Sequence, residues 1–250
     1  MKLPLYFISD LHLRLNPSED EMQRQKRLFL FFNHISKTKG TLFIVGDLFD
    51  FYFEYKDVIP KYYFHFYSEI LQLRKSGVNT HFILGNHDFW VLDFMKKTLM
   101  YKVYEKDFEF SLNGKSFLLT HGDGLLSWDW GYRLMKKLIR SPIFVWFYRF
   151  LHPNLGYWIA KKISENRGHY IHSDEHNNKI LNDLKPFANE KLENGIDYIL
   201  CGHYHQATEK QIGSGKLVIL GDWFTFDSYA IFDGEDLVLK RWKSIDNLTS

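Results

Sequence analysis

The chain has 250 residues, a formal net charge of +2, an aromatic content of 18% and one cysteine. This length suffices for one large α/β core, and the lone Cys201 excludes an intrachain disulfide. Because Cys201 lies within an apolar run, we expect a buried, unreactive thiol, which fits a reducing compartment. No signal peptide is expected before the first strand, and no apolar run approaches the ~20 residues of a membrane-spanning helix.

Strands and helices alternate in the first third of the sequence. Short apolar runs predict buried parallel strands over residues 3–8, 41–45 and 80–84. Helical spacing predicts helices over residues 19–37 and 62–75, each followed by a glycine that ends the helix. This alternation is typical of a layered α/β domain.

Later in the chain, antiparallel strands join this pattern. The Asn113-Gly114 pair predicts a hairpin between residues 107–112 and 115–120. The remaining expected elements are a helix over residues 174–193, a strand over 198–201, and three strands joined by tight turns between 216 and 242. We find no internal repeat or interdomain linker in the sequence, so residues 1–250 are expected to form a single domain.

One segment differs from the rest in composition. Residues 133–170 contain eight Lys or Arg residues against the single acidic residue Glu165, and residues 141–160 contain seven large aromatics. Because Pro142 and Pro153 divide this segment into helical pieces, we expect an inserted helical subdomain. Basic and aromatic side chains together favour a lipid-bearing anion or an anionic bilayer as partner. The alternative is ordinary helix packing, with the aromatics in the core and the lysines in solvent.

Five apolar runs end in polar residues that can bind metal or move protons. Because the loops at the carboxyl ends of such strands open into a crevice, we expect these residues to meet there. The candidate ligands are Asp10, His12, Asp47, Asn86, His121, His203 and His205.

This set contains imidazoles, carboxylates and one amide but no thiolate, a mixture that suits Mn, Fe or Zn. Seven ligands are too many for one tetrahedral zinc and suit two ions that share a bridging carboxylate, for which Asp47 is the expected residue. Two ions ~3.5–4 Å apart can clamp a phosphate and lower the pKa of a bridging water. Each motif alone is commonplace, so the prediction depends on their joint occurrence at strand ends.

The ordered set resembles the motifs of the calcineurin-like metallophosphoesterases. The matching blocks are Asp10-x-His12, Gly46-Asp47, Gly85-Asn86-His87-Asp88, His121-Gly122-Asp123 and Gly202-His203-x-His205. The resemblance implies a two-sheet sandwich flanked by helices in α-β-β-α layers, with a dinuclear site at the strand ends. We expect manganese as the metal, with Fe or Zn as the alternatives. One ion would then be held by Asp10, His12, Asp47 and His205, and the other by Asp47, Asn86, His121 and His203.

The same resemblance implies roles for the residues beside the ions. Beyond the ligand Asn86, the catalytic residues would be His87, which hydrogen-bonds the phosphoryl group or protonates the leaving oxygen, and Asp88, which orients the His87 ring.

Within that superfamily, the chain is similar to the UDP-2,3-diacylglucosamine pyrophosphatases of lipid A synthesis. The similarity rests on the length, on the residues that follow His121, and on the basic and aromatic insertion. It implies that residues 125–170 form a helical lid that packs acyl chains. The implied substrate contacts are His87, Asp129, Tyr132, Arg133, Lys161, Lys162 and Arg167. In two places the chain departs from this branch: His87 stands where the branch has Arg, and Ser164-Glu165-Asn166-Arg167 matches imperfectly.

Three hypotheses about function follow. The first is metal-dependent cleavage of the pyrophosphate bond of UDP-2,3-diacylglucosamine, in the cytoplasm or in peripheral contact with the cytoplasmic face of the inner membrane. The second keeps the chemistry but assigns a soluble nucleotide or another phosphoester as substrate. A basic patch is compatible with nucleic acid, although nucleic acid is not the expected partner. The third is a non-catalytic scaffold, which is disfavoured because all seven ligands are present.

Overall fold

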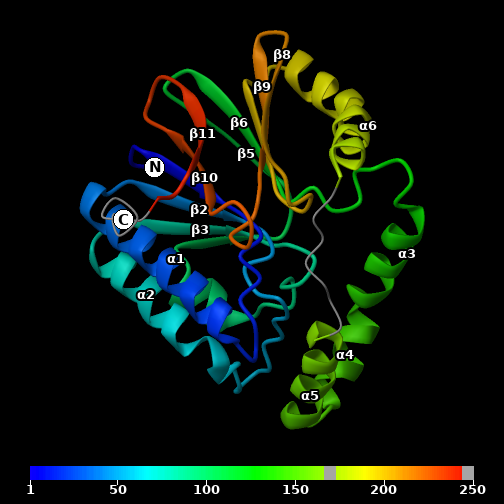
Figure 1. Cartoon of the computed structure of the whole chain (residues 1–250). Coiled ribbons are helices and arrows are strands. Elements are labelled where there is room, and N and C mark those ends of the chain that lie inside the picture. The colour runs from blue at the N-terminus through cyan, green and yellow to red at the C-terminus, as the bar shows by residue number, and fades with distance from the viewer. Residues whose placement is uncertain (166–172, 244–250) are drawn as a thin grey trace.

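The computed structural model describes residues 1–165 and 173–243, and its strands form two sheets that stack face to face (Figure 1). The first sheet contains, in spatial order, β11 (Leu237–Arg241), β10 (Ser228–Phe232), β1 (Leu5–Ile8), β2 (Thr41–Val45), β3 (Asn79–Ile83) and β4 (Lys102–Tyr104). The second contains β5 (Phe108–Leu112), β6 (Lys115–Thr120), β7 (Tyr198–Cys201), β9 (Gly215–Leu220) and β8 (Ala207–Ile212). Strands β1 to β4 run parallel to one another, as do β6, β7 and β9, so each group ends at one edge of its sheet.

Helices cover the outer faces of both sheets. The helices α1 (Glu19–Thr38) and α2 (Phe64–Lys75) lie on the first sheet, and α6 (Asp174–Glu193) lies on the second (Figure 1). Alternate residues of β1 show the layering: Phe7 faces the core between the sheets, whereas Ile8 faces the core beneath α1. The predicted α-β-β-α sandwich is therefore confirmed.

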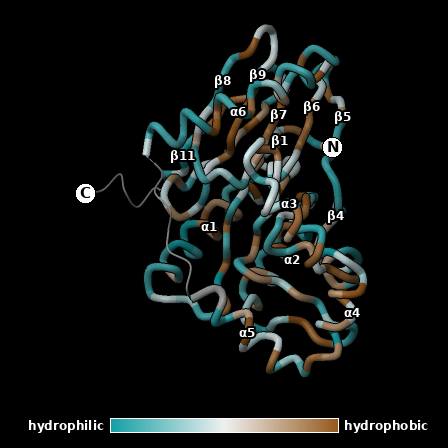
Figure 2. The backbone as a smooth tube through the Cα atoms, turned by 90° about the vertical axis from the view of Figure 1, so that its right-hand side faces the viewer, coloured by the Kyte–Doolittle hydropathy of each residue, from teal (hydrophilic) through white to brown (hydrophobic). Residues whose placement is uncertain are grey.

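The central strands are apolar throughout because both of their faces are buried. All residues of β1, β2 and β7 are buried, which explains why these runs were visible in the sequence. Figure 2 shows the same concentration of apolar residues along the middle of the molecule. The expected helices and strands are confirmed to within a few residues, and Asn113 and Gly114 form the predicted hairpin turn with positive φ angles.

Four elements were not anticipated. They are the short strand β4, the π-helix η2 (Phe94–Leu99), the edge strand β8 and the 3-10 turn η1 (Lys61–Tyr63) that begins the predicted second helix. Strand β8 was missed because it is largely polar and none of its residues is buried, as an edge strand can be. None of the described helices is long and apolar enough to cross a membrane.

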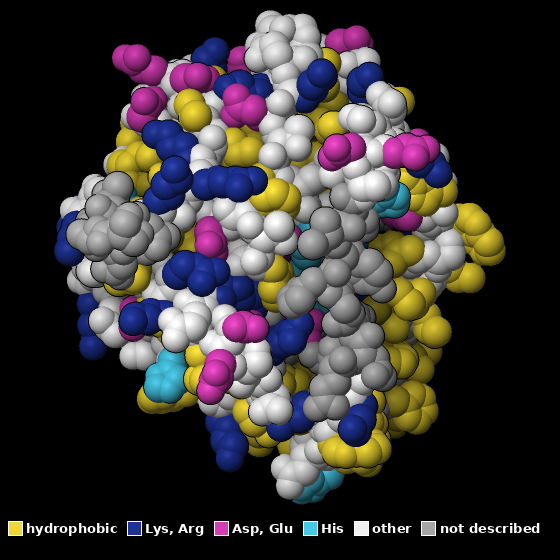
Figure 3. Space-filling view, viewed as in Figure 1, with side chains coloured by type: hydrophobic (Ala, Val, Ile, Leu, Met, Phe, Trp, Pro, Cys, Tyr) yellow, Lys and Arg dark blue, Asp and Glu magenta, His cyan; other side chains and the backbone are white. Residues whose placement is uncertain are grey.

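Three helices follow β6: α3 (Trp130–Ile139), α4 (Pro142–Phe150) and α5 (Pro153–Glu165). Each of the two prolines opens a helix, as predicted, because its missing N–H is not needed there. Of the aromatics in this segment, Tyr157 is buried, but Trp146, Phe147 and Phe150 are more than half exposed. Hydrophobic side chains accordingly gather along the right-hand edge of the molecule, over α3 and α4 (Figure 3). The core-packing alternative therefore holds for only part of the segment.

Candidate metal centre

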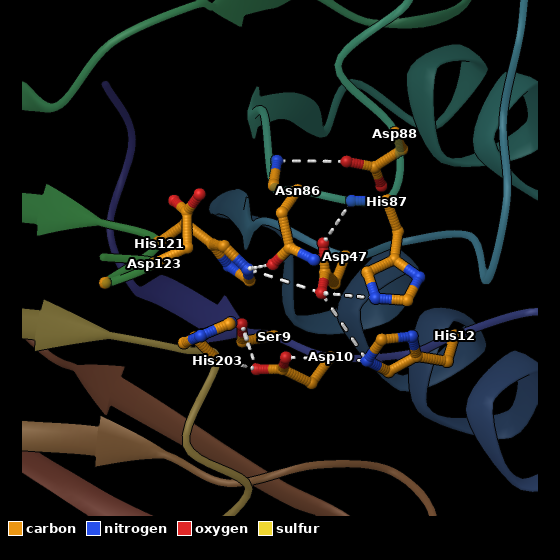
Figure 4. A network of polar contacts seen from close by, with 12 residues as sticks. Ser9, Asp10, His12, Asp47, Asn86, His87, Asp88, His121, Asp123 and His203 are labelled. Carbon is orange, nitrogen blue, oxygen red and sulfur yellow. Dashed lines mark hydrogen bonds and ion pairs between the residues drawn. The ribbon is translucent and has the colours of Figure 1, made fainter. Parts of the chain in front are cut away.

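All seven candidate ligands lie in loops at the carboxyl ends of parallel strands, and all but His205 are labelled in Figure 4. The loops after β1, β2 and β3 supply Asp10, His12, Asp47 and Asn86, and the loops after β6 and β7 supply His121, His203 and His205. Three groups of these and neighbouring side chains place their ligand atoms within 4.8 Å of one another. The structure thus brings together residues that are up to 195 positions apart in the sequence.

Asp47 occupies the middle of this cluster. Its Oδ2 atom lies 3.3 Å from Nε2 of His121, 3.6 Å from Nε2 of His12 and 3.8 Å from Nε2 of His87. Its Oδ1 atom accepts a hydrogen bond of 3.0 Å from the backbone N–H of His87. One carboxylate oxygen therefore faces both halves of the cluster, as a bridging ligand would.

The first half is formed by Asp10, His12 and His205. Oδ1 of Asp10 lies 3.6 Å from Nε2 of His12 and 3.7 Å from Nε2 of His205. The other oxygen, Oδ2, accepts hydrogen bonds from Ser9 Oγ at 2.7 Å and from the backbone N–H of His203 at 2.8 Å. Both Asp10 Oδ1 and His12 Nε2 are buried without a hydrogen-bond partner. Since buried polar atoms are rarely left unpaired, these two fit the ligands of a cation.

The second half is formed by Asn86, His121 and His203 together with Asp47. Nδ1 of His121 lies 3.1 Å from the carbonyl oxygen of Val45, so a proton there leaves Nε2 with a lone pair. That Nε2 atom lies 3.0 Å from Oδ1 of Asn86, and Oδ2 of Asp47 is almost as near. Three acceptor atoms converge on one point, an arrangement that a divalent cation would stabilise.

The electrostatics of the cluster agree with this geometry. Burial opposes the ionisation of Asp10 and Asp47, yet the neighbouring histidines lower the pKa of Asp10 to about 2 and hold that of Asp47 well below its usual value. Burial likewise opposes a charge on His121, but the adjacent Asp47 raises the pKa of its imidazole to about 10. The pocket therefore favours positive charge.

The backbone of the ligand loops is strained. Asp10, His12, Asp47, His203 and His205 all have positive φ angles, between 41° and 69°. Such conformations cost of order 1–3 kcal/mol each for residues other than glycine, and they cluster at functional sites. The strain is consistent with loops shaped for ligation rather than for stability.

A second carboxylate orients His205. Oδ2 of Asp222 lies 3.1 Å from Nδ1 of His205, and Oδ1 accepts the backbone N–H groups of Phe224 and Thr225. This contact turns Nε2 of His205 toward Asp10, the arrangement by which proteins fix a metal-binding imidazole. Asp222 was missed in the sequence, although it follows the apolar run of β9 just as the ligands follow theirs.

His87 and Asp88 do not interact as the resemblance implied. Nδ1 of His87 lies 2.7 Å from the carbonyl oxygen of Asp50. The Asp88 carboxylate instead accepts backbone N–H groups of Leu48, Phe49 and Gly85 at 2.6–3.2 Å, and thus ties two ligand loops together. Burial and the charge of Asp47 raise the pKa of Asp88 to about 7. The prediction that Asp88 orients the His87 ring was wrong, because three backbone donors occupy that carboxylate.

Only some of the predicted substrate-contacting residues lie beside the metal ligands. The Tyr132 ring lies 5.9 Å from that of His203, and its hydroxyl donates to Asp123. Arg133 donates to the carbonyl oxygens of Gly124 and Leu126, so its guanidinium holds the turn before α3.

The other predicted contact residues lie on either side of these two in the chain. Asp129 immediately precedes α3, Lys161 lies over the Tyr62 ring at 4.4 Å, and the side chain of Lys162 is exposed. Arg167 lies outside the described residues.

A cationic cluster beside the ligands was not predicted as part of the site. Asp123 pairs with Lys136 at 2.6 Å and lies 3.6 Å from Arg140. The three residues come from the loop after His121 and from α3, and their proximity depends on how that helix is oriented. The sequence signal, the excess of basic residues after position 133, did not single them out.

Comparisons with known proteins agree on a family of phosphoester hydrolases. Residues 3–207 match the family model of the calcineurin-like phosphoesterases. A relative from Porphyromonas gingivalis named UDP-2,3-diacylglucosamine hydrolase is 31% identical over 98% of this chain and all of its own. A relative of the same name from Pseudomonas putida is 28% identical over 88% of this chain and 90% of its own. Among solved structures, GAP50 of Plasmodium, the anchor in the inner membrane complex, matches 96% of this chain and 84% of its own with 11% identity and a TM-score of 0.51, a likeness of fold alone.

Proposed function

The chain belongs to the calcineurin-like phosphoesterase family and is a hydrolase, and from this premise we propose that it cleaves UDP-2,3-diacylglucosamine. Water adds to one phosphorus of the diphosphate, the bridging P–O bond breaks, and 2,3-diacylglucosamine 1-phosphate and UMP are released. The observation that carries the chemistry is the pair of acceptor clusters that share Asp47. The substrate is supported by the relatives of that name and by the apolar helices α3 to α5.

The residues present fit two divalent ions. Asp10, His12, Asp47 and His205 would hold one, and Asp47, Asn86, His121 and His203 would hold the other, with manganese the proposed metal. When bound, such ions neutralise phosphate charge and lower the pKa of a water molecule. The chain itself supplies the fixed positions, because Ser9, Val45 and Asp222 hold the outward atoms of Asp10, His121 and His205.

His87 is the proposed proton donor or phosphate ligand. Its Nδ1 atom is held at the Asp50 carbonyl oxygen, which leaves Nε2 facing the Asp47 carboxylate at 3.8 Å. With Nδ1 donating to that carbonyl, Nε2 can donate to a phosphoryl or leaving oxygen only when the ring is protonated.

We further propose that α3 and α4 rest on the cytoplasmic face of the inner membrane. Trp130, Ile143 and Phe150 are each at least 70% exposed, an unusual fraction for side chains of this size. Lys137 on α3 and Arg149 on α4 are both exposed, and their charges suit an anionic lipid surface. A membrane-bound enzyme could draw an acylated substrate directly from the bilayer.

Hydrolysis assays test the proposed activity. The UDP-lipid in detergent should be cleaved faster than simple nucleotide diesters, with manganese and not without it. The Asn86→Ala variant should fold but lose activity, since one ligand of the second half is removed. A soluble nucleotide that outcompetes the lipid would favour the alternative substrate class, and an inert protein with less than one ion per chain would favour a scaffold.

Vesicle flotation tests the membrane contact. The double variant Trp146→Ser/Phe147→Ser removes two side chains that are more than half exposed on α4, and it should bind anionic vesicles more weakly. Tyr101→Ser is the matched control, because Tyr101 is 56% exposed and its backbone N–H donates to Thr80 of β3, in the first sheet (Figure 1). Equal loss in both variants would argue against a defined membrane face.

A further inference from the structure

The Asp123 carboxylate gathers two side chains of α3 and that of Arg140, the residue that caps the end of α3. Oδ2 of Asp123 accepts a hydrogen bond of 2.9 Å from the Tyr132 hydroxyl and lies 2.6 Å from Nζ of Lys136 and 3.6 Å from Nη2 of Arg140. Lys136 also donates to the backbone carbonyl oxygen of Asp123 at 3.0 Å. Because these residues are spaced by one helical turn, they lie on one face of α3.

This cluster borders the second half of the metal centre. Asp123 follows His121 by two residues, and Figure 4 shows its carboxylate beside that imidazole. Nη2 of Arg140 donates at 2.9 Å to the carbonyl oxygen of Gly85, the residue before Asn86. The Tyr132 ring packs 5.9 Å from that of His203. Three proposed ligands of one ion, His121, Asn86 and His203, thus each lie beside a residue of the cluster.

The cluster also carries a net positive charge that is partly exposed to solvent. Two cations face one carboxylate, so one positive charge is left uncompensated within the cluster. The side chains of Lys136 and Arg140 remain about a quarter exposed, at 25% and 27%, whereas Asp123 is 8% exposed. Nε of Arg140 is buried and has no acceptor among the described residues, and the guanidinium rests on the Phe89 ring at 4.5 Å. Arg133 on the same helix differs, because carbonyl oxygens occupy its guanidinium.

We propose that Lys136 and Arg140 form a subsite for the second phosphate of a diphosphate, the one that the metal ligands do not hold. This inference rests on the proposed function and deepens it. A planar guanidinium and an ammonium side by side can make several charge-assisted hydrogen bonds to one phosphate group. In the absence of substrate, Asp123 keeps both cations oriented toward the centre. The subsite selects diphosphate substrates over phosphate esters that carry a single phosphate.

Calorimetry with two ligands tests the subsite without catalysis. The manganese-loaded protein is titrated with UMP and with the non-hydrolysable α,β-methylene-UDP, which share the uridine and differ by one phosphate. The wild type should bind α,β-methylene-UDP more tightly. Arg140→Gln and Lys136→Gln should each reduce that preference roughly 10- to 100-fold, as expected for the loss of one charge-assisted contact. Arg140→Lys should retain part of it, because the charge remains.

Lys137→Gln is the matched control. Lys137 lies on the same helix with an exposed side chain, so this variant removes an equal charge without touching the cluster, and its preference should equal that of the wild type. A wild type that shows no preference, or Lys136 and Arg140 variants that keep it while folded, would overturn the inference. Cleavage of the UDP-lipid, measured separately, tests the proposed function. A failure of the subsite proposal can therefore be distinguished from a failure of the proposed function.

Discussion

Asp222 should control the affinity of one metal ion and not the other. The Asp222→Asn variant keeps the shape of a side chain that is 3% exposed. Oδ1 of Asp222 accepts the backbone N–H groups of Phe224 at 2.9 Å and Thr225 at 2.6 Å, so an asparagine would keep its oxygen there. Its amide NH₂ group would then take the place of Oδ2, which lies 3.1 Å from Nδ1 of His205.

That change reverses the tautomer of His205. An amide donor at Nδ1 favours the form with the proton on Nε2, and a protonated Nε2 cannot bind a metal ion. Loss of such an orienting contact lowers metal affinity by about 10- to 100-fold. The equivalent change in binding free energy is about 1.4–2.8 kcal/mol.

Competition with a chelator measures the effect. Manganese titrations of the wild type should fit two sites, and Asp222→Asn should weaken only the site formed with Asp10 and His12. Asp233→Asn is the matched control, since Asp233 also accepts two backbone N–H groups in a turn but lies outside the cluster. If Asp222→Asn bound both ions like the wild type while His205→Ala lost one, the orienting role would be refuted.

Three further predictions concern the surroundings of the centre. Arg24 is 5% exposed and donates to the carbonyl oxygens of Leu11 and His12, so Arg24→Met should lower the free energy of unfolding by roughly 3 kcal/mol or more, because buried Glu21 loses its partner. Chemical denaturation measures this, and an unchanged midpoint would contradict it. A Cβ at Gly85 would overlap the Asp47 carboxylate, so Gly85→Ala should bind fewer than two manganese ions per chain while it stays folded; two ions by elemental analysis would disprove the steric argument. Burial lowers the pKa of His81 from 6.5 to about 4, so the unfolded chain takes up the proton first, and stability falls as the pH drops from about 6.5 to about 4. The metal-free wild type should lose up to about 3 kcal/mol more than His81→Gln over that range in denaturation curves, and parallel losses would contradict the argument.

Much of the fold was predictable because its central strands are buried on both faces. Continuous apolar runs such as Thr41–Val45 predicted strands, and the polar residue after each run predicted where the site lies. Strand β8 (Ala207–Ile212) was missed because an edge strand needs no apolar face, and none of its residues is buried. The pattern of apolar and polar residues depends on which side chains are buried, so strands that are buried on both faces are the easiest to predict from sequence.

Contacts between distant loops could not be predicted in the same way. Asp88 follows His87 directly, yet its carboxylate reaches the loop of Leu48 instead, because consecutive side chains in a turn point in different directions. Arg140 lies 55 residues from Gly85 and meets it only through the orientation of α3. Such partners depend on how elements pack, which no short motif encodes.

Anomalous diffraction from crystals grown with manganese would locate the bound ions. Two peaks are expected, roughly 3.5–4 Å apart. They should lie on either side of the Asp47 carboxylate, one near Asp10, His12 and His205 and the other near Asn86, His121 and His203. A single peak, or two peaks away from Asp47, would contradict the dinuclear centre and the hydrolysis proposed from it.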